Sequence, residues 1–174
     1  MEFSTIQWRT WIPDESATLL FVLNGDEILL IRKKRGLGAG KVNGPGGRLE
    51  PGETPVQCAI RETREELGVI AHQPRLCGRH RFQFVSGYAL QVFVYSSRAF
   101  TGTAIETDEA IPLWTPVDAI PYDQMWEDDR IWLPRLLDGE LFDGRYLFDD
   151  DAMLDYVLEP VARAATLEAL TLNA

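Results

Sequence analysis

The stretch GRLEPGETPVQCAIRETREELGV, residues 47–69, carries five glutamates and decides what fold to expect. Three of them, Glu62, Glu65 and Glu66, stand at positions i, i+3 and i+4 of a helical pattern. Side chains at this spacing are neighbours on a helix surface, and like charges there repel. All three carboxylates are therefore expected to leave one side of a helix, where something positively charged must offset their repulsion.

The signals at both ends of this stretch predict where the helix begins and ends. Thr54 precedes Pro55, and Gln57 follows three residues after Thr54, which is the pattern of a capping box. Gly68 suits the left-handed position that closes a helix. The spacing thus predicts a helix that runs to Leu67. Its apolar stripe, expected to pack on the core opposite the glutamates, consists of Val56, Ile60, Thr63 and Leu67.

A glycine-rich loop over residues 35–47 and a Pro51-Gly52 turn come just before this helix. Hard divalent cations prefer carboxylate and carbonyl oxygens, and Mg²⁺ commonly bridges to substrate phosphates. An acidic helix beside exposed loop backbone therefore suits a metal and a polyphosphate. Arg61 cannot bind a metal, so we expect its guanidinium to pair with Glu53 across the turn. The alternative for these residues taken alone is a solvated helix face with ordinary ion pairs.

The overall composition is that of one globular domain. The chain has 174 residues, with 17 Lys and Arg against 27 Asp and Glu, so its formal charge is −10. This balance argues against binding of long nucleic acid or of an anionic membrane, because both require a basic face. We expect a single domain over residues 1–174, with 1–16 and 163–174 as peripheral extensions.

Two cysteines, Cys58 and Cys77, form neither a disulfide framework nor a metal-ligand spacing. We expect both to be small buried or half-buried side chains. The first sixteen residues lack the basic start and the apolar core of a signal peptide, and no apolar run is long enough to span a bilayer. The expected location is cytoplasmic.

Hydrophobic alternation and turn residues predict the remaining elements. Strands are expected at 17–23, 27–34, 79–87, 88–100 and 111–121, a helix at 125–139, a hairpin within 144–160, and a helix-prone or frayed tail at 161–174.

The spacing of Gly47, Glu53, Arg61-Glu62, Glu65-Glu66 and Gly68-Val69 resembles the box motif of the Nudix family. Members are hydrolases that act on nucleoside diphosphates linked to another moiety. Thr63 stands where the family usually has an aliphatic residue. The resemblance implies an α+β fold, with a mixed sheet sandwiched between helices (α/β/α). It also implies that Mg²⁺, for which Mn²⁺ can substitute, is bound at Gly46, Glu62, Glu65, Glu66 and Glu109.

Outside the box, the stretches KKRGLGAGKVNGPGG, ETDE and IPYDQMWEDDRIWLP resemble the Nudix hydrolases that act on oxidized purine nucleoside triphosphates. The similarity covers residues 17–161 and implies hydrolysis of substrates such as 8-oxo-dGTP or 2-hydroxy-dATP to the monophosphate and pyrophosphate. This reaction avoids DNA damage by cleaning the nucleotide pool. Leu37 and Val42 depart from the aromatic residues expected there. The substrate-binding residues implied are Thr18, Lys33, Asn43, Gly46, Gly47, Phe82, Phe84, Trp126, Asp128 and Asp129.

The chemistry of these side chains agrees with a purine pocket. Asp128 and Asp129 are adjacent acids beside tryptophans, and burial raises the pKa of a carboxyl, so one of the two can stay protonated. One acid then accepts from a purine N–H while the other donates. Asn43 offers a donor and an acceptor, and Trp126 can stack on a base. The alternative for the two acids alone is a simple interaction with a helix N-terminus.

The sequence leaves several points open. Glu65, Glu66 and Glu109 are all candidates for the general base, with Glu53 and Arg61 as further members of the catalytic set. Competing functions are hydrolysis of ADP-ribose or an ordinary dNTP, isomerisation of isopentenyl diphosphate, and ligand sensing without catalysis. We expect a modified purine nucleoside triphosphate as the partner, no polymeric nucleic acid, no membrane, and a monomer.

Overall fold

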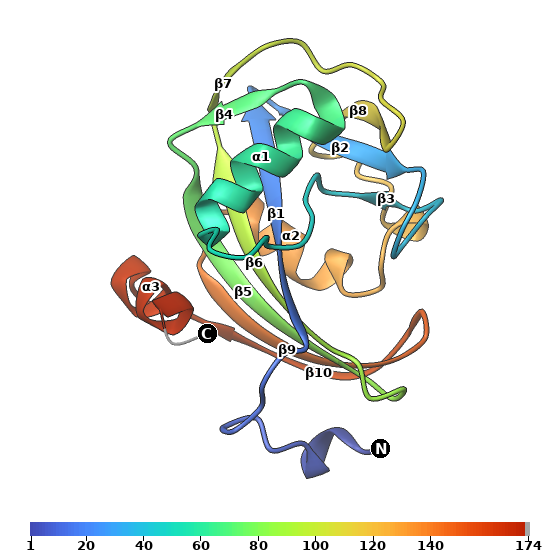
Figure 1. The fold of residues 1–174 in the computed structure, drawn as a ribbon, viewed down its shortest axis with the longest axis vertical. Coiled ribbons are helices and arrows are strands. Elements are labelled where there is room, and N and C mark those ends of the chain that lie inside the picture. The colour runs from blue at the N-terminus through green and yellow to red at the C-terminus, as the bar shows by residue number, and fades with distance from the viewer. Residues whose placement is uncertain (173–174) are drawn as a thin grey trace.

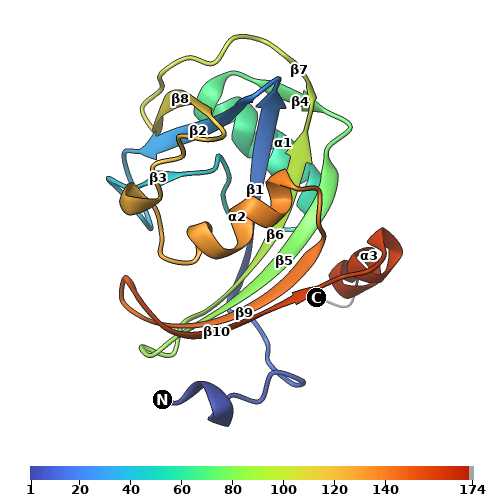
Figure 2. The ribbon, with the colours of Figure 1, turned by 180° about the vertical axis from the view of Figure 1, so that it is seen from behind.

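A computed structural model describes residues 1–172 of the chain and shows a mixed sheet between two helices. Helix α1 lies over one face of the sheet in Figure 1, and α2 lies over the opposite face in Figure 2. The helices are α1 (Pro55–Leu67), α2 (Asp129–Leu137) and α3 (Ala164–Leu172), with 3-10 turns at Phe3–Thr5 and Tyr122–Gln124. The strands are β1 (Glu15–Asn24), β2 (Glu27–Lys33), β3 (Val42–Asn43), β4 (Ile70–His72), β5 (Arg75–Phe84), β6 (Ala89–Ser97), β7 (Ala99–Thr101), β8 (Ala110–Pro116), β9 (Phe142–Asp149) and β10 (Ala152–Pro160).

The main sheet has eight strands in the order β10-β9-β5-β6-β1-β2-β3, and β8 also pairs with β2. Two pairs are parallel, β1 with β6 and β5 with β9, whereas the β1–β2 and β9–β10 hairpins are antiparallel. The α+β class and the mixed sheet between helices are therefore confirmed.

Beyond their turn, the strands of the first hairpin separate, and the glycine-rich loop lies between them. Strands β1 and β2 pair only near their turn, at Leu23 with Ile28 and at Asn24 with Glu27. Farther along β1, the N–H of Leu20 donates to the carbonyl of Pro45 (2.9 Å), and the N–H of Thr18 donates to that of Gly47 (2.8 Å). The loop before α1 is thereby fixed against the sheet, between β1 and the acidic helix.

Alternate side chains of β1 enter two separate cores, because successive residues of a strand point to opposite faces. Leu20 and Val22 pack with Leu67 beneath α1. Phe21 and Leu23 pack with the residues beneath α2. The site described below lies where these two layers meet the loop.

Helix α1 has the ends that were predicted, and its predicted apolar stripe packs on the core, although the most buried residues are partly different ones. The capping box between Thr54 and Gln57 is present, and Gly68 adopts a left-handed conformation with φ 73°. Thr63 is fully buried, and its hydroxyl donates to a backbone carbonyl of the preceding turn. Val56 and Ile60, however, are only half-buried. The most buried face is formed instead by Cys58, Ala59, Thr63, Glu66 and Leu67.

Several predicted elements have the wrong bounds, and a helix and a strand show the physical reasons. The helix expected over 125–139 spans only 129–137, because the carboxylate of Asp129 accepts the N–H of Trp126 (3.1 Å) and holds the preceding residues in a turn. The strand expected over 88–100 ends at Ser97, whose hydroxyl donates to the carbonyls of His72 and Ala99. The chain then continues as β7, which pairs with β4, a strand that was not predicted.

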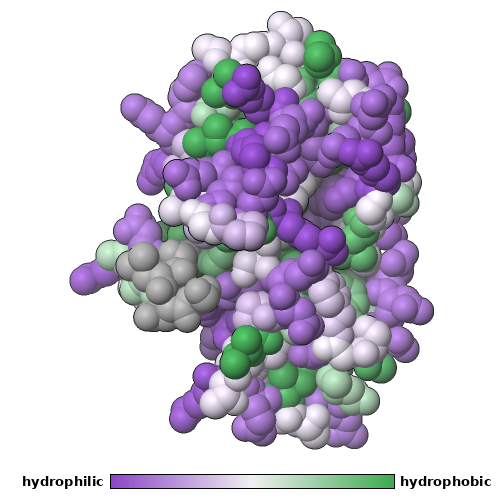
Figure 3. Space-filling view, in the orientation of Figure 1, coloured by the Kyte–Doolittle hydropathy of each residue, from purple (hydrophilic) through white to green (hydrophobic). Residues whose placement is uncertain are grey.

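The N-terminal residues and helix α3 lie outside the sheet and the two helices that cover it (Figure 1). Near the N-terminus, the indole N–H of Trp11 donates to Gln83 on β5 (2.9 Å). At the other end α3 follows β10, while residues 173 and 174 of the expected extension 163–174 lie outside the described residues. The face in Figure 3 is mainly hydrophilic, in keeping with the high charge of the chain. None of the described helices has the length and apolarity needed to cross a membrane.

Candidate active site

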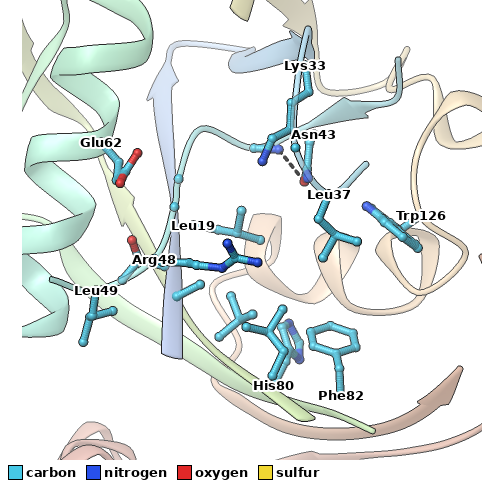
Figure 4. Close-up of a pocket in the computed structure, with 18 of the residues that line it drawn as sticks. Leu19, Lys33, Leu37, Asn43, Arg48, Leu49, Glu62, His80, Phe82 and Trp126 are labelled. Atoms are coloured by element: carbon cyan, nitrogen blue, oxygen red, sulfur yellow. Dashed lines mark hydrogen bonds between the residues drawn. The ribbon is translucent and has the colours of Figure 1, made fainter. Parts of the chain in front are cut away.

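One cavity of about 640 Å³ brings the predicted site residues together. Figure 4 shows Glu62 on one side of it and Trp126 on the other, with Lys33 and Asn43 between them. Every residue predicted to bind substrate lines this cavity, as do Glu62, Glu66 and Glu109. Glu53, Arg61 and Glu65 are not part of its lining.

The acidic end of the cavity is built by α1 and the loop that precedes it. Glu66 is only 2% exposed, and its Oε2 accepts the N–H of Gly46 (2.9 Å). Burial raises the pKa of Glu66 to about 7 and also raises the pKa of Glu62. A Cβ at Gly47 would collide with the Glu62 carboxylate, so the absence of a side chain there lets that carboxylate lie against the loop.

A second loop adds Glu109 to this end. The Glu109 carboxylate forms an ion pair with Arg35, and its negative charge helps to raise the pKa values of Glu62 and Glu66. The positive charge of Lys33 opposes this effect, because it lowers the pKa of Glu66. The loop is fixed to the helix because the Thr107 hydroxyl donates to the carbonyl of Glu66 (2.8 Å).

Arg61 joins the turn to the helix as predicted. Its Nε and Nη2 donate to the two oxygens of Glu53 at 2.8 and 2.9 Å, which holds the pKa of Glu53 down at about 2. Its Nη1 donates to Glu62 (2.7 Å) and Glu65 (3.0 Å). The Glu65 side chain is 54% exposed and is not part of the cavity lining. Glu62 and Glu65 nevertheless share one guanidinium nitrogen of Arg61, so these two carboxylates lie on the same side of the helix, as expected.

The donor set of this end fits a magnesium ion. Among residues 1–172, no three His, Cys, Asp or Glu side chains are grouped so that they alone could hold a metal ion. Mg²⁺ keeps several waters and usually takes one or two carboxylates plus substrate phosphates, rather than a complete protein cage. Two buried carboxylates, Glu62 and Glu66, beside loop backbone meet this requirement.

The opposite end of the cavity is aromatic and carries the second acidic pair. Asp128 and Asp129 are each 3% exposed. Asp128 accepts the indole N–H of Trp132 (2.9 Å), and it makes no capping bond to α2 although it precedes that helix. Burial raises the pKa of both acids, and for Asp129 the neighbouring charge of Asp128 adds to the effect. One carboxyl of the pair can thus stay protonated near neutral pH, and this geometry disfavours a simple helix-end role.

Trp126 and Asn43 complete this end. Gly38 lies so close to the indole that a Cβ there would meet Nε1 at 2.9 Å, and the Lys41 ammonium lies 5.0 Å from the ring centroid. The side-chain oxygen Oδ1 of Asn43 accepts the backbone N–H of Gly44 (2.9 Å), which sets the orientation of the Asn43 side-chain amide.

Several lining residues were not predicted, among them His80, Arg48, Tyr88 and Phe148. His80 precedes Phe82 by two residues on β5, so extending the Phe82–Phe84 alternation by one step would have found it. Phe148 is placed by the parallel pairing of β9 with β5, opposite Phe84. No local signal in the sequence gives that register.

A mixed sheet between two helices, with an acidic helix held against a glycine-rich loop, is the arrangement of a Nudix domain. The model of that family, described as NUDIX domain, matches residues 13–136, and the chain belongs to the Nudix family.

Two relatives indicate which members of the Nudix family this chain resembles in sequence, and a crystal structure indicates which it resembles in fold. The chain is 40% identical over 146 residues to the oxidized purine nucleoside triphosphate hydrolase of Mus musculus and 38% identical to that of Danio rerio. Each match covers 83% of this chain and 94% of the relative. The fold is similar to the crystal structure of the MutT protein from Bacillus halodurans, with a TM-score of 0.76 and 25% identity, covering 83% of this chain and 97% of that one.

Proposed function

We propose that this protein hydrolyses oxidized or otherwise modified purine nucleoside triphosphates, of the 8-oxo-dGTP and 2-hydroxy-dATP type, to the monophosphate and pyrophosphate. The observation that carries the proposal is the single cavity, which has a pair of carboxylates suited to a metal at one end and a pair suited to a purine at the other. The relatives named as oxidized purine nucleoside triphosphate hydrolases support the same substrate class.

The acidic end would hold Mg²⁺, or Mn²⁺ in its place, through Glu62 and Glu66, with the Gly46 carbonyl, Glu65 and Glu109 as further ligands. The bound ion would polarise the phosphoryl oxygens and make a water more acidic. Water adds to phosphorus, and the bond between the α- and β-phosphates breaks to release pyrophosphate. Glu65, Glu66 and Glu109 are the candidates for the general base that takes the proton of that water.

The aromatic end would select the base. Trp126 offers its face for stacking, while the protonated and ionised members of the Asp128–Asp129 pair donate to and accept from the purine edge. Asn43 supplies another donor and acceptor. Lys33, between the two ends, would neutralise charge on the phosphates, and Arg61 with Glu53 would hold the loop in place.

We also propose that residues 1–174 act as one domain, as a monomer in the cytoplasm that removes damaged nucleotides before they enter DNA. Cys58 and Cys77 are both free thiols in the structure, which agrees with a reducing compartment.

The decisive experiment, with Mg²⁺ and with or without EDTA, measures pyrophosphate release from 8-oxo-dGTP, 2-hydroxy-dATP and dGTP, and AMP formation from ADP-ribose, whose hydrolysis releases no pyrophosphate. We expect release from the modified purines to exceed release from dGTP, and EDTA to abolish it. Faster hydrolysis of dGTP or of ADP-ribose would replace the proposed substrate class, and activity that EDTA leaves intact would refute the metal site.

A further inference from the structure

Two buried polar side chains beneath the aromatic end have no hydrogen-bond partner within the described part of the chain. The side chain of His80 is fully buried, and neither ring nitrogen is paired. The hydroxyl of Tyr146, which is also fully buried, is unpaired as well. Unpaired buried groups cost free energy and are rare in native proteins, so a cluster of them calls for an explanation.

The imidazole of His80 forms part of the floor of the base pocket, by which we mean the aromatic end of the cavity, where the purine is proposed to bind. It lines the cavity, and Figure 4 shows it beside the ring of Phe82. Its centroid lies 4.7 Å from that of Trp132, the indole that donates to Asp128. Like the two acids, His80 lies below the surface, so a base reaches it only by entering the pocket to its full depth.

A glycine on the neighbouring strand keeps space open beside both polar groups. Gly144 pairs with His80 in the parallel register of β5 and β9. A Cβ on Gly144 would lie 2.6 Å from His80 Nδ1 and 2.5 Å from the Tyr146 hydroxyl. The two unpaired atoms therefore face the same small space.

The His80 ring is neutral at the pH of any ordinary assay, because burial lowers its pKa to about 3. A neutral imidazole has one N–H donor and one acceptor nitrogen. The floor of the pocket thus offers hydrogen-bonding capacity without charge, whereas the neighbouring acid pair carries charge.

We propose that His80 is a further specificity-determining residue of this site, whose neutral imidazole hydrogen-bonds the extra polar group that an oxidized purine carries into the floor of the pocket. This inference rests on the proposed function. A substrate that forms hydrogen bonds with the unpaired polar groups of a site binds more tightly than one that leaves them unpaired. An ordinary purine lacks the added oxygen that could form such a bond.

The test compares kcat/KM for 8-oxo-dGTP with kcat/KM for dGTP in His80→Leu, which replaces the ring by an apolar side chain. We expect the ratio to fall about tenfold, because a lost substrate hydrogen bond removes preference of this order. The melting temperature should stay the same or rise, since the two unpaired nitrogens are gone. A wild-type ratio in this variant would show that His80 is only a core residue and would overturn the proposal.

His72→Leu is the matched control, because His72 is exposed on β4, and its ring forms a hydrogen bond with Thr101. Its substrate ratio should equal that of the wild type. His80→Phe removes both nitrogens and keeps an aromatic ring, so it repeats the test if His80→Leu does not fold; an unchanged ratio there would equally refute the proposal. Wild-type protein that is inactive on 8-oxo-dGTP would refute the proposed function itself, whereas an active wild type with unaltered variants would refute only the role of His80.

Discussion

The two ends of the cavity each centre on a pair of buried carboxylates, yet their surroundings differ. At the acidic end, Glu66 accepts a backbone N–H from Gly46 and feels the positive charge of Lys33. At the aromatic end, Asp128 accepts an indole N–H, and Asp129 has the charge of its neighbour as its main electrostatic influence. Burial raises the pKa at both ends.

Burial alone therefore does not determine the chemical role of a pair of acids. Glu62 and Glu66 lie beside loop backbone that can supply further oxygens, so a cation can complete their environment. The acids near Trp132 lie among aromatic rings, so a shared proton is the simpler way to reduce their charge. Removal of the metal should therefore affect the acidic end, and removal of the purine base of the substrate should affect the aromatic end.

The largest expected effect is at the acidic end, in Glu66→Gln. Glutamine keeps the size of the side chain and can still accept the N–H of Gly46, but it cannot carry the negative charge. We expect kcat/KM to fall by at least about 10²-fold, because both metal binding and proton transfer depend on that charge. Pyrophosphate release measures the loss, and calorimetry should show that nucleotide still binds through its base.

Glu140→Gln provides the control for this variant. Glu140 is exposed, forms an ion pair with Arg135, and is not part of the cavity lining. Its activity should match the wild type. Normal turnover in Glu66→Gln would contradict the assignment of the acidic end.

The local part of this architecture follows directly from the sequence. Thr54, Gln57 and Gly68 act on backbone groups of their own helix, so the bounds of α1 can be predicted without tertiary information. The pairing of Arg61 with Glu53 is equally local, because a tight turn brings the two side chains together.

What the sequence could not give is the rotation of α1 and the register of the sheet. Adjacent residues of a helix differ by about 100° in direction, so Glu65 and Glu66 cannot both face one cavity squarely. Packing against β1 decides which one enters, and it buries Glu66. In the same way, Gly144 and Tyr146 reach His80 only through the pairing of β9 with β5, which joins segments far apart in sequence.

A smaller effect is expected at the aromatic end, in Asp128→Asn. The amide oxygen can still accept the indole N–H of Trp132, so the fold should be retained, but the acid pair can no longer share a proton. We expect kcat/KM for the modified purine to fall about 10- to 100-fold, the range for losing a matched hydrogen bond to substrate. Steady-state kinetics on 8-oxo-dGTP measures this change.

A titration of the same Asp128→Asn protein with Mn²⁺ should give the wild-type affinity. Glu62 lies on one side of the cavity, and Trp126, whose backbone N–H donates to Asp129, lies on the other (Figure 4). Asp138→Asn, an exposed change at the far end of α2, serves as the control. Equal losses of metal affinity and of purine selectivity would show that the two ends are not independent.

The smallest effect is the pH dependence of stabilisation by metal. Without metal, burial raises the pKa of Glu66 from 4.5 to about 7, so the folded protein holds a proton there that the unfolded chain has released. This contribution to stability is fully present below pH 4.5 and is lost as the pH rises through 7. A cation binds the ionised form, so it competes with that proton. At pH 6 saturating Mg²⁺ should stabilise the protein by about 1.4 kcal/mol less than at pH 8, or about 3 °C in the melting temperature. Calorimetry at both pH values, with Mg²⁺ or EDTA, measures the difference; Asp128→Asn should retain it and Glu66→Gln should lose it. A larger stabilisation by Mg²⁺ at pH 6 than at pH 8 would mean that the protonation of another group controls metal binding. It would contradict the interpretation that a cation binds at the acidic end whereas a proton is shared at the aromatic end.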